Sequence, residues 1–367
     1  MNDVVVGFIG FGLIGGSLAH ALREQNPKHK LTAYCYNRNK VNAGLTKALQ
    51  DGVLNDIVYE LEDLGECDLL FLCAPVLSNI AYLAQLKSIL KPDCIITDVG
   101  SVKGNICKEA VALGLGSQFV GGHPMAGSEK TGYTNSSSRL LENAYYILTP
   151  TRETKNSITD TLFQLIKSLG SIPILLNPSE HDDITAAISH VPHIIASCLV
   201  NMVRKEDNED KMKTLAAGGF KDITRIASSS PVMWQNICLT NTDSILRFLD
   251  KYIHSLNEVK ESLQLNREAA IFDFFQDAGE YRDSIPNTSA GLLNKIYELY
   301  LDIIDETGAI ATIATLLATN LISIKNIGII HNREFEEGVL RIVFYSQNSC
   351  EAAASLLRKH NYTVYER

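Results

Sequence analysis

The sequence predicts an α/β domain with a parallel sheet, followed by an all-α domain and a small α+β domain. Its 367 residues exceed what one ordinary hydrophobic core accommodates. Short apolar runs alternate with amphipathic stretches up to residue 177, and long helical periods dominate after it. Strand-like alternation returns at residue 296. We therefore expect domains at 1–177, 178–290 and 296–367.

The predicted strands of the first domain are short apolar runs. Alternation of such runs with amphipathic stretches is typical of strands joined by crossover helices, as in a parallel sheet. The runs lie at residues 4–9, 31–36, 68–73, 94–98, 119–121, 145–148 and 172–176.

The all-α domain is predicted to begin near Pro178, where the strand pattern stops. Ser179, with Asp182 three residues later, resembles a capping box, in which both side chains satisfy free backbone N–H groups at a helix start. Residues 283–293 are rich in turn formers and predict a linker to the third domain.

The third domain is predicted to have the order β-α-β-β-α-β, which is that of the ferredoxin-like split motif. Its predicted strands are 296–304, 322–330, 339–345 and 362–365, and its predicted helices are 309–320 and 349–360.

Composition excludes several classes of protein. A formal net charge of -9 argues against a nucleic-acid partner. The N-terminus lacks the basic region and cleavage site of a signal peptide, and the apolar stretch 186–203 is too polar for a membrane span. The eight cysteines show no paired spacing, so neither a disulfide framework nor a zinc site is indicated. We expect a cytoplasmic protein without a membrane partner.

A glycine-rich turn follows the first predicted strand. Gly10, Gly12 and Gly15 have the spacing of a dinucleotide-binding fingerprint, with Leu13 and Ile14 opening the helix. The first glycine permits a tight turn, the second allows close approach of a pyrophosphate, and the third lets helix pack on strand. The pattern favours a Rossmann-type domain over a glycine-rich turn without a ligand.

The choice of cofactor depends on the end of the second strand. An acidic residue usually holds the adenosine ribose of NAD there, whereas this chain has Asn37 followed by Arg38. Asn37 can bind a ribose hydroxyl, and Arg38 could meet the 2′-phosphate of NADP or remain a solvated surface charge. We expect NAD, with NADP not excluded.

Two further segments follow predicted strand ends, at 98–104 and 121–130. Ligands of open α/β sheets lie at such ends. A lone histidine is more often structural than catalytic, but the glycines around His123 and its place at a strand end favour an exposed, functional side chain.

Five segments, taken in order, resemble the prephenate dehydrogenase family. They are residues 10–19, 98–104, 123–130, 189–193 and 218–225. The resemblance covers the first two domains and implies an NAD-dependent enzyme that converts prephenate to 4-hydroxyphenylpyruvate and CO2 in tyrosine biosynthesis. It also implies a homodimer formed through the helical domain.

The resemblance implies roles for individual residues. His123 would accept the proton of the substrate's ring hydroxyl, Ser101 would hydrogen-bond that hydroxyl, and Arg225 would bind a substrate carboxylate. The spacing of Asp222, three residues before Arg225, suggests that it orients this arginine, and an exposed salt bridge between the two is the plain alternative. Other positions in the pocket or its gate would be His193, Glu129, Gly218 and Trp234, the last being equally suited to anchoring a core.

Other functions remain open on sequence alone. One alternative is an arogenate dehydrogenase, whose substrate has an amine where prephenate has a keto group. Another is a non-catalytic nucleotide or amino-acid sensor, which would share the fold. A 3-hydroxyacid dehydrogenase fits less well because residues 189–193 and 218–225 do not match it. No metal is expected, because His190 and His193 have no third ligand at suitable spacing and Pro192 lies between them.

The third domain resembles an ACT domain. In such modules the turn after the first strand, here 305–308, forms an amino-acid site with second-strand residues such as Asn326. L-tyrosine is the expected feedback effector, and it could instead compete at Arg225. A module that only aids dimerisation is the alternative.

Overall fold

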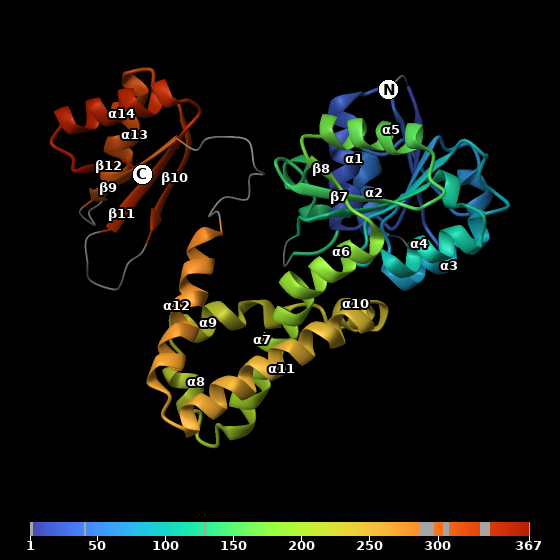
Figure 1. Ribbon diagram of the computed structural model, residues 1–367. Coiled ribbons are helices and arrows are strands. Elements are labelled where there is room, and N and C mark those ends of the chain that lie inside the picture. Colours follow the sequence, from blue (N-terminus) through green and yellow to red (C-terminus); the bar gives the residue numbers. More distant parts are fainter. Residues whose placement is uncertain are drawn as a thin grey trace. The chain divides into compact units, whose positions relative to one another are not determined.

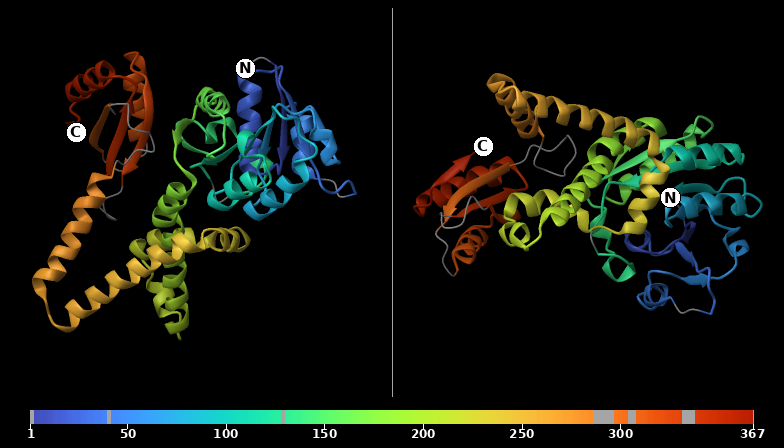
Figure 2. Two further views of the ribbon diagram at one scale, coloured as in Figure 1. Left: turned by 45° about the vertical axis from the view of Figure 1, so that its right-hand side comes forward. Right: turned by 90° about the horizontal axis from the view of Figure 1, so that it is seen from below.

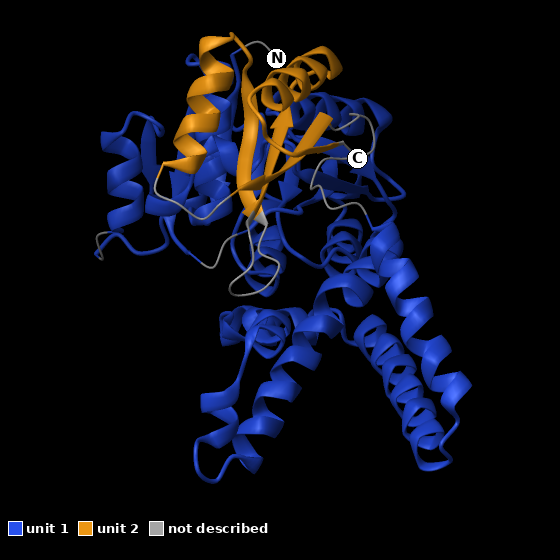
Figure 3. Ribbon diagram, turned by 90° about the vertical axis from the view of Figure 1, so that its left-hand side faces the viewer, with its two compact units in different colours: residues 1–291 blue, residues 292–367 orange. Residues whose placement is uncertain are grey.

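The computed structural model describes residues 3–39, 42–127, 130–285, 297–303, 308–330 and 338–366. Contacts between Cα atoms divide the chain into two compact units, Met1–Gly291 and Leu292–Arg367 (Figures 1 and 3). The expected α/β and all-α regions thus lie in one unit, and the small α+β region forms the other.

The first unit contains a sheet of eight strands in the order β3-β2-β1-β4-β5-β6-β7-β8. All seven predicted strands are present, and β3 is an additional edge strand of three residues that has no apolar run to reveal it. The strands are β1 Val5–Ile9, β2 Lys30–Tyr34, β3 Asp56–Val58, β4 Leu69–Leu72, β5 Ile95–Asp98, β6 Phe119–Pro124, β7 Tyr145–Pro150 and β8 Ile172–Leu175.

The expectation of a wholly parallel sheet was wrong at one place. Strand β7 runs antiparallel to β6, with His123 opposite Ile147, while the other neighbouring pairs are parallel. The reason is the connection: residues between β6 and β7 form short 3-10 turns at Tyr133–Asn135 and Ser138–Leu140 instead of the crossover helix that a parallel neighbour requires.

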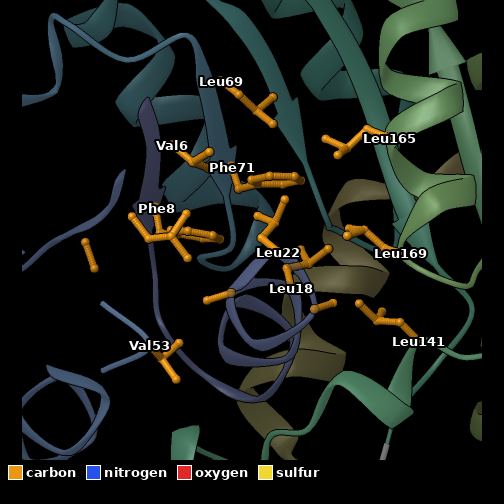
Figure 4. Packing of buried hydrophobic residues seen from close by; sticks show 14 of the residues in the cluster. Val6, Phe8, Leu18, Leu22, Val53, Leu69, Phe71, Leu141, Leu165 and Leu169 are labelled. Carbon is orange, nitrogen blue, oxygen red and sulfur yellow. The ribbon is translucent and has the colours of Figure 1, made fainter. Parts of the chain in front are cut away.

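Helices cover both faces of this sheet, which explains why its strands are apolar on both sides. They are α1 Leu13–Gln25, α2 Ala43–Gln50, α3 Val76–Leu86, α4 Gly104–Ala112 and α5 Asn156–Ser168. Helices α1 and α5 pack on one face, where Figure 4 shows the core residues Val6, Phe8, Leu18, Leu22 and Leu165. Helices α3 and α4 pack on the other face, with Ile9, Leu70, Leu86 and Ile106.

The helical region of the first unit follows β8 (Figure 2). It consists of α6 Pro178–Thr185, a π-helical turn at Ala186–His190, α7 Val191–Glu206, α8 Lys211–Leu215, α9 Gly218–Thr224, a 3-10 turn at Arg225–Ser228, α10 Pro231–Thr240, α11 Thr242–Gln264 and α12 Glu268–Ser284. The predicted linker at 283–293 therefore starts within α12, and its residues from 286 on lie outside the described part.

The predicted capping box at Ser179 and Asp182 was wrong. The N-cap of α6 is Asn177, whose side chain accepts the backbone N–H of Glu180 at 2.8 Å. Pro178 at the first helical position shifts the start of the helix by two residues. Asp182 is therefore free to make the tertiary contacts described below.

The run Pro178–Glu206 is long and apolar enough to cross a membrane by length and composition alone, contrary to the expectation drawn from its polar residues. One such helix is weak evidence, because core helices of globular proteins pass the same test. In this structure the run supplies His181 and Asp182 to hydrogen bonds with residues of the α/β region.

The second unit has the predicted β-α-β-β-α-β order, and its sheet has the strand order β10-β11-β9-β12. Every neighbouring pair is antiparallel, as in the ferredoxin-like motif. The elements are β9 Tyr297–Ile303, α13 Ala309–Thr319, β10 Ile324–Ile330, β11 Gly338–Phe344, α14 Gln347–Lys359 and β12 Val364–Glu366. Leu299, Leu301, Ile313, Ile342 and Leu357 form its core.

Candidate functional site

Three predicted site elements meet at the carboxyl edge of the sheet. The glycine-rich turn follows β1, Ser101 follows β5, and His123 lies near the end of β6. Because β1, β4, β5 and β6 are adjacent and parallel, their carboxyl ends share one edge. Chain connections diverge at β1 and β4, which is where open α/β sheets bind dinucleotides.

The turn after β1 has the shape that a pyrophosphate requires. Gly10 has φ +87°, and a Cβ there would lie 2.5 Å from the backbone N of Ala74. A Cβ on Gly12 would meet no atom within 4 Å, so space is open beside the turn. Gly12 also caps α1 without a side-chain hydrogen bond, which leaves the N–H groups at Leu13 and Ile14 for an anion. These residues fit the phosphates of NAD.

The residues expected to meet the adenosine ribose follow β2. The Asn37 side chain accepts the backbone N–H of Asn39 at 3.0 Å. The Arg38 guanidinium lies 3.6 Å from Glu60 and 5.2 Å from the ring centre of Tyr59. A carboxylate beside Arg38 disfavours a 2′-phosphate there, which agrees with the expectation of NAD.

His123 is hydrogen-bonded to a second histidine that sequence reasoning missed. Its Nδ1 lies 2.8 Å from Nε2 of His181 on α6. Nδ1 of His181 in turn lies 2.8 Å from Oδ1 of Asp182, and the His181 side chain is completely buried. Loss of hydration, together with His181, Lys103 and His190 nearby, holds the pKa of His123 well below 6.5. The His123 imidazole is therefore neutral at pH 7.

A buried ion pair lies beneath the strand that carries His123. Lys103 and Asp98 are both fully buried and pair through Nζ and Oδ2. Lys103 Nζ also donates to the carbonyl of Gly122 at 2.7 Å, while Asp98 accepts the N–H groups of Gly100 at 2.8 Å and Gly122 at 3.2 Å. The pair thus joins β5, β6 and the segment that contains Ser101.

A second group of predicted residues lies on the helical region. The rings of His193 and Trp234 stack with centroids 3.8 Å apart, and His190 meets Trp234 edge-on at 6.0 Å. Burial lowers the pKa of His190 to about 4. Burial also lowers the pKa of His193, and the charge of Arg225 contributes to that shift, which indicates that Arg225 is nearby.

The remaining predicted residues are placed as follows. Gly218 begins α9, and a Cβ there would meet no atom within 4 Å. Asp222 is exposed on α9, one turn before Arg225, which is also exposed. Glu129 lies outside the described residues. Trp234 is half-buried, and among the described atoms its buried Nε1 has no hydrogen-bond partner.

Sequence reasoning missed His181 and Asp182 because neither stands in a motif with ligand or catalytic spacing. Asp182 was assigned to a local cap, whereas its carboxylate accepts the backbone N–H groups of Lys103 at 2.8 Å and Gly104 at 2.7 Å, far away in the sequence. The segment 98–104 was singled out, but it gave no sign that Asp98 and Lys103 pair. Only three-dimensional contacts reveal these roles.

A cavity of about 1020 Å³ in the first unit does not contain this constellation. It is lined by residues such as Asn105, Lys108, Asp183 and Arg247, and it adjoins the site at Gly104, Asp182 and Asn241. The glycine turn, His123 and Arg225 are absent from its lining. We place the site by its chemistry at the strand edge instead.

Family models match two consecutive stretches of the chain. Residues 18–175 match the nucleotide-binding domain of prephenate dehydrogenase, and residues 177–277 match the dimerization domain of prephenate dehydrogenase. The two stretches meet next to Pro178, where the sequence changes from strand to helix patterns.

Curated relatives extend this similarity over both units. Prephenate dehydrogenase of Bacillus subtilis is 38% identical over 357 residues, covering 96% of this chain and 95% of the relative. Prephenate dehydrogenase of Lactococcus lactis is 33% identical over 356 residues, covering 96% of each.

Solved structures match about three quarters of the chain. Prephenate dehydrogenase of Aquifex aeolicus, solved with hydroxyphenyl propionate and NAD+, has a TM-score of 0.72 and 31% identity, covering 78% of this chain and 99% of its own. Arogenate dehydrogenase of Synechocystis has a TM-score of 0.68 and 29% identity, covering 77% and 100%. The chain therefore belongs to the prephenate dehydrogenase family of NAD-dependent oxidoreductases.

Proposed function

We propose that the protein catalyses the oxidative decarboxylation of prephenate to 4-hydroxyphenylpyruvate and CO2 with NAD, in L-tyrosine biosynthesis. The observation that carries this function is the neutral imidazole of His123 at the strand edge that also holds the dinucleotide turn. A neutral imidazole is a competent proton acceptor, and hydride transfer from a carbinol carbon needs one beside the hydroxyl.

The bound cofactor and the residues of the strand edge have distinct roles in the proposed reaction. When bound, NAD supplies the acceptor for the hydride of the ring carbinol. His123 takes the hydroxyl proton as the hydride leaves and returns it to the phenolate oxygen formed when CO2 departs. Ser101 holds the same hydroxyl. The large drive of aromatisation means that the protein need only orient groups and manage one proton.

Arogenate dehydrogenase is the second candidate, favoured by the similarity to the Synechocystis enzyme. Absorbance at 340 nm distinguishes the two when prephenate and arogenate are each offered with NAD and with NADP. We expect the highest kcat/KM for prephenate with NAD. Reduction of neither cofactor with either substrate would leave a nucleotide-binding sensor as the function.

Replacing Arg225 with lysine should raise KM for prephenate about 10- to 100-fold with little change in kcat, because a bidentate, charge-assisted contact to a carboxylate is lost. Steady-state kinetics measure both constants. The matched control is Arg204→Lys, an exposed arginine three turns beyond His193 on α7. An unchanged KM in the Arg225 variant would place this arginine outside the pocket.

A homodimer is the proposed assembly, formed through the helical region. Helices α11 and α12 expose large apolar side chains: Ile253, Leu256, Leu263, Phe272 and Phe275 are each about half or more exposed. The buried cluster inside this region is small, with Ala186, Val191 and Ile245 at its centre. These observations and the matched dimerization family support burial against a second copy.

We propose a division of labour along the chain, with residues 1–177 holding NAD and residues 178–290 supplying the substrate wall and dimer contacts. Residues 296–367 would form an ACT-like regulatory domain, which their ferredoxin-like topology supports. The net charge of -9 and the water-soluble, charged substrate favour a cytoplasmic enzyme without nucleic-acid or membrane partners.

L-tyrosine is the proposed effector of the ACT-like domain. Its expected site is the turn at 305–308, of which only Gly308 is described, with Asn326 exposed on β10. Gly308 has φ +96° and caps α13 without a side-chain hydrogen bond. A glycine in this conformation leaves helix N–H groups open to a carboxylate.

A protein truncated after Gly291 should keep its activity and lose inhibition by tyrosine, because the effector site is removed while the catalytic groups remain. The measurement is the tyrosine concentration for half-inhibition, compared with that of the full chain and of Asn326→Ala. Allosteric coupling of ~1–3 kcal/mol corresponds to about a 5- to 150-fold change in that concentration. Unchanged inhibition of an active truncated protein would locate tyrosine at Arg225 instead.

A further inference from the structure

The hydrogen-bonded row of His123, His181 and Asp182 fixes where the protons lie. Asp182 receives two backbone N–H groups, from Lys103 at 2.8 Å and Gly104 at 2.7 Å, so its carboxylate is held as an acceptor. Nδ1 of His181, 2.8 Å from Oδ1 of Asp182, must therefore be the protonated nitrogen.

The tautomer of His123 follows from that of His181. Burial lowers the pKa of His181, so its ring is neutral at pH 7 and Nε2 has a lone pair. Nε2 of His181 lies 2.8 Å from Nδ1 of His123 and can only accept a hydrogen bond, so Nδ1 of His123 must carry the proton and donate it. A neutral His123 with Nδ1–H has its lone pair on Nε2, on the far side of the ring from His181.

We propose that His181 and Asp182 are positioning residues that hold His123 in the Nδ1–H tautomer, with the lone pair of Nε2 directed to the substrate hydroxyl. This role rests on the proposed function, because it deepens the assignment of His123 as the proton acceptor. When His123 takes the hydroxyl proton at Nε2, its Nδ1–H remains bonded to His181. The Asp182 carboxylate stabilises the resulting imidazolium through the neutral His181 ring.

The surroundings of the row support this role. A Cβ on Gly104 would lie 2.7 Å from Oδ2 of Asp182, so a glycine is needed for the carboxylate to sit there. The side-chain amide nitrogen of Asn241 donates to the backbone carbonyl of Asp182 at 2.8 Å. The same nitrogen lies 3.1 Å from Nδ1 of the neighbouring His190. Lys103 is a further charged group near His123, and its ammonium pairs with the buried carboxylate of Asp98.

Two variants of His181 separate positioning from simple packing. His181→Leu keeps an apolar side chain of similar volume but removes the acceptor. His181→Gln retains a side-chain oxygen that can accept Nδ1–H of His123. We expect kcat to fall about 10²-fold in the leucine variant, the cost of misdirecting one catalytic group, with KM nearly unchanged. The glutamine variant should recover most of this loss.

The matched control is His29→Leu. His29 is equally buried and its Nδ1 accepts the backbone N–H of Val4 at 3.3 Å, on the opposite end of β1 from the glycine turn. This variant loses the same kind of buried ring and hydrogen bond. It should lower the melting temperature without changing kcat, KM or the pH profile.

A direct measurement of the tautomer is independent of turnover. In ¹⁵N-histidine NMR spectra of the full-length protein at pH 7, with His123 assigned by its absence in His123→Asn, we expect Nδ1 protonated and Nε2 unprotonated. His181→Leu should convert His123 to a mixture or to the Nε2–H form. A wild-type protein with Nε2–H on His123 would overturn the inference even if it oxidises prephenate.

The kinetic outcomes are equally decisive. Full kcat in His181→Leu, with the expected tautomer in the wild type, would show that the row is structural and refute its positioning role. A protein that has the expected tautomer but reduces no cofactor with prephenate or arogenate would refute the proposed function and leave the tautomer assignment of His123 intact. The tautomer experiment thus distinguishes failure of one proposal from failure of the other.

Discussion

Replacing His123 with asparagine is expected to lower kcat about 10²-fold or more while leaving KM for prephenate nearly unchanged. Asparagine keeps a polar side chain at the end of β6 but cannot accept a proton at pH 7. Substrate contacts from the helical region, such as that proposed for Arg225, remain in place. Steady-state kinetics provide the measurement, and weaker binding with intact turnover would contradict the role of His123.

The pH dependence of the wild-type enzyme offers a second check on His123. The neutral imidazole is the active form, so kcat/KM should fall as pH decreases through the pKa of His123. Because burial and the nearby His181 and Lys103 hold that pKa well below 6.5, activity should persist at pH 6.5 and decline only in more acidic solution. The matching limb should disappear from the profile of His123→Asn.

Lys103→Met is expected to lower the free energy of unfolding of the first unit by about 3–5 kcal/mol, because Asp98 would be left as a buried charge without its partner. Both side chains are fully buried, and Lys103 also holds the carbonyl of Gly122 next to His123. Urea unfolding at pH 7, followed by the fluorescence of Trp234, measures the change. No second tryptophan exists to complicate the signal.

Two further variants make the stability result specific. The control Lys91→Met breaks the partly exposed pair with Asp68, whose atoms lie 2.5 Å apart, and should cost no more than about 1 kcal/mol. Adding Asp98→Asn to Lys103→Met removes the unpaired charge and should restore part of the lost stability. A loss for Lys103→Met as small as that for Lys91→Met would show that the buried pair contributes little.

Local sequence patterns were sufficient to predict most of the fold. The seven apolar runs of the first unit became strands because burial on both faces of a sheet demands continuous apolar sequence. The β-α-β-β-α-β order of the last unit could be predicted because apolar residues recur every two residues in its strands and about every 3.6 residues in its helices. The glycine turn at Gly10–Gly15 could be predicted because the backbone there leaves no room for a Cβ at Gly10 or Gly15.

The errors arose where distant residues decided the outcome. Strand β3 is a three-residue edge strand that exists because β2 offers hydrogen bonds to it. The direction of β7 depends on how 20 residues from Met125 to Ala144 return to the sheet, and no local pattern encodes that path. Asp182 looked like part of a helix cap, but it binds the start of α4 instead.

The sequence by itself determined most of the secondary structure and the dinucleotide turn, because backbone sterics and apolar periodicity act over a few residues. Its resemblance to a known family indicated His123 as the candidate proton acceptor. Only the tertiary structure decided the protonation chemistry of the site. It placed His181 behind His123, 58 residues away in the sequence, and it brought Asp182 to the backbone of Lys103, 79 residues away. It also buried the ion pair of Asp98 and Lys103. Desolvation and hydrogen-bond direction depend on what packs around a side chain, and that is fixed only when the chain has folded.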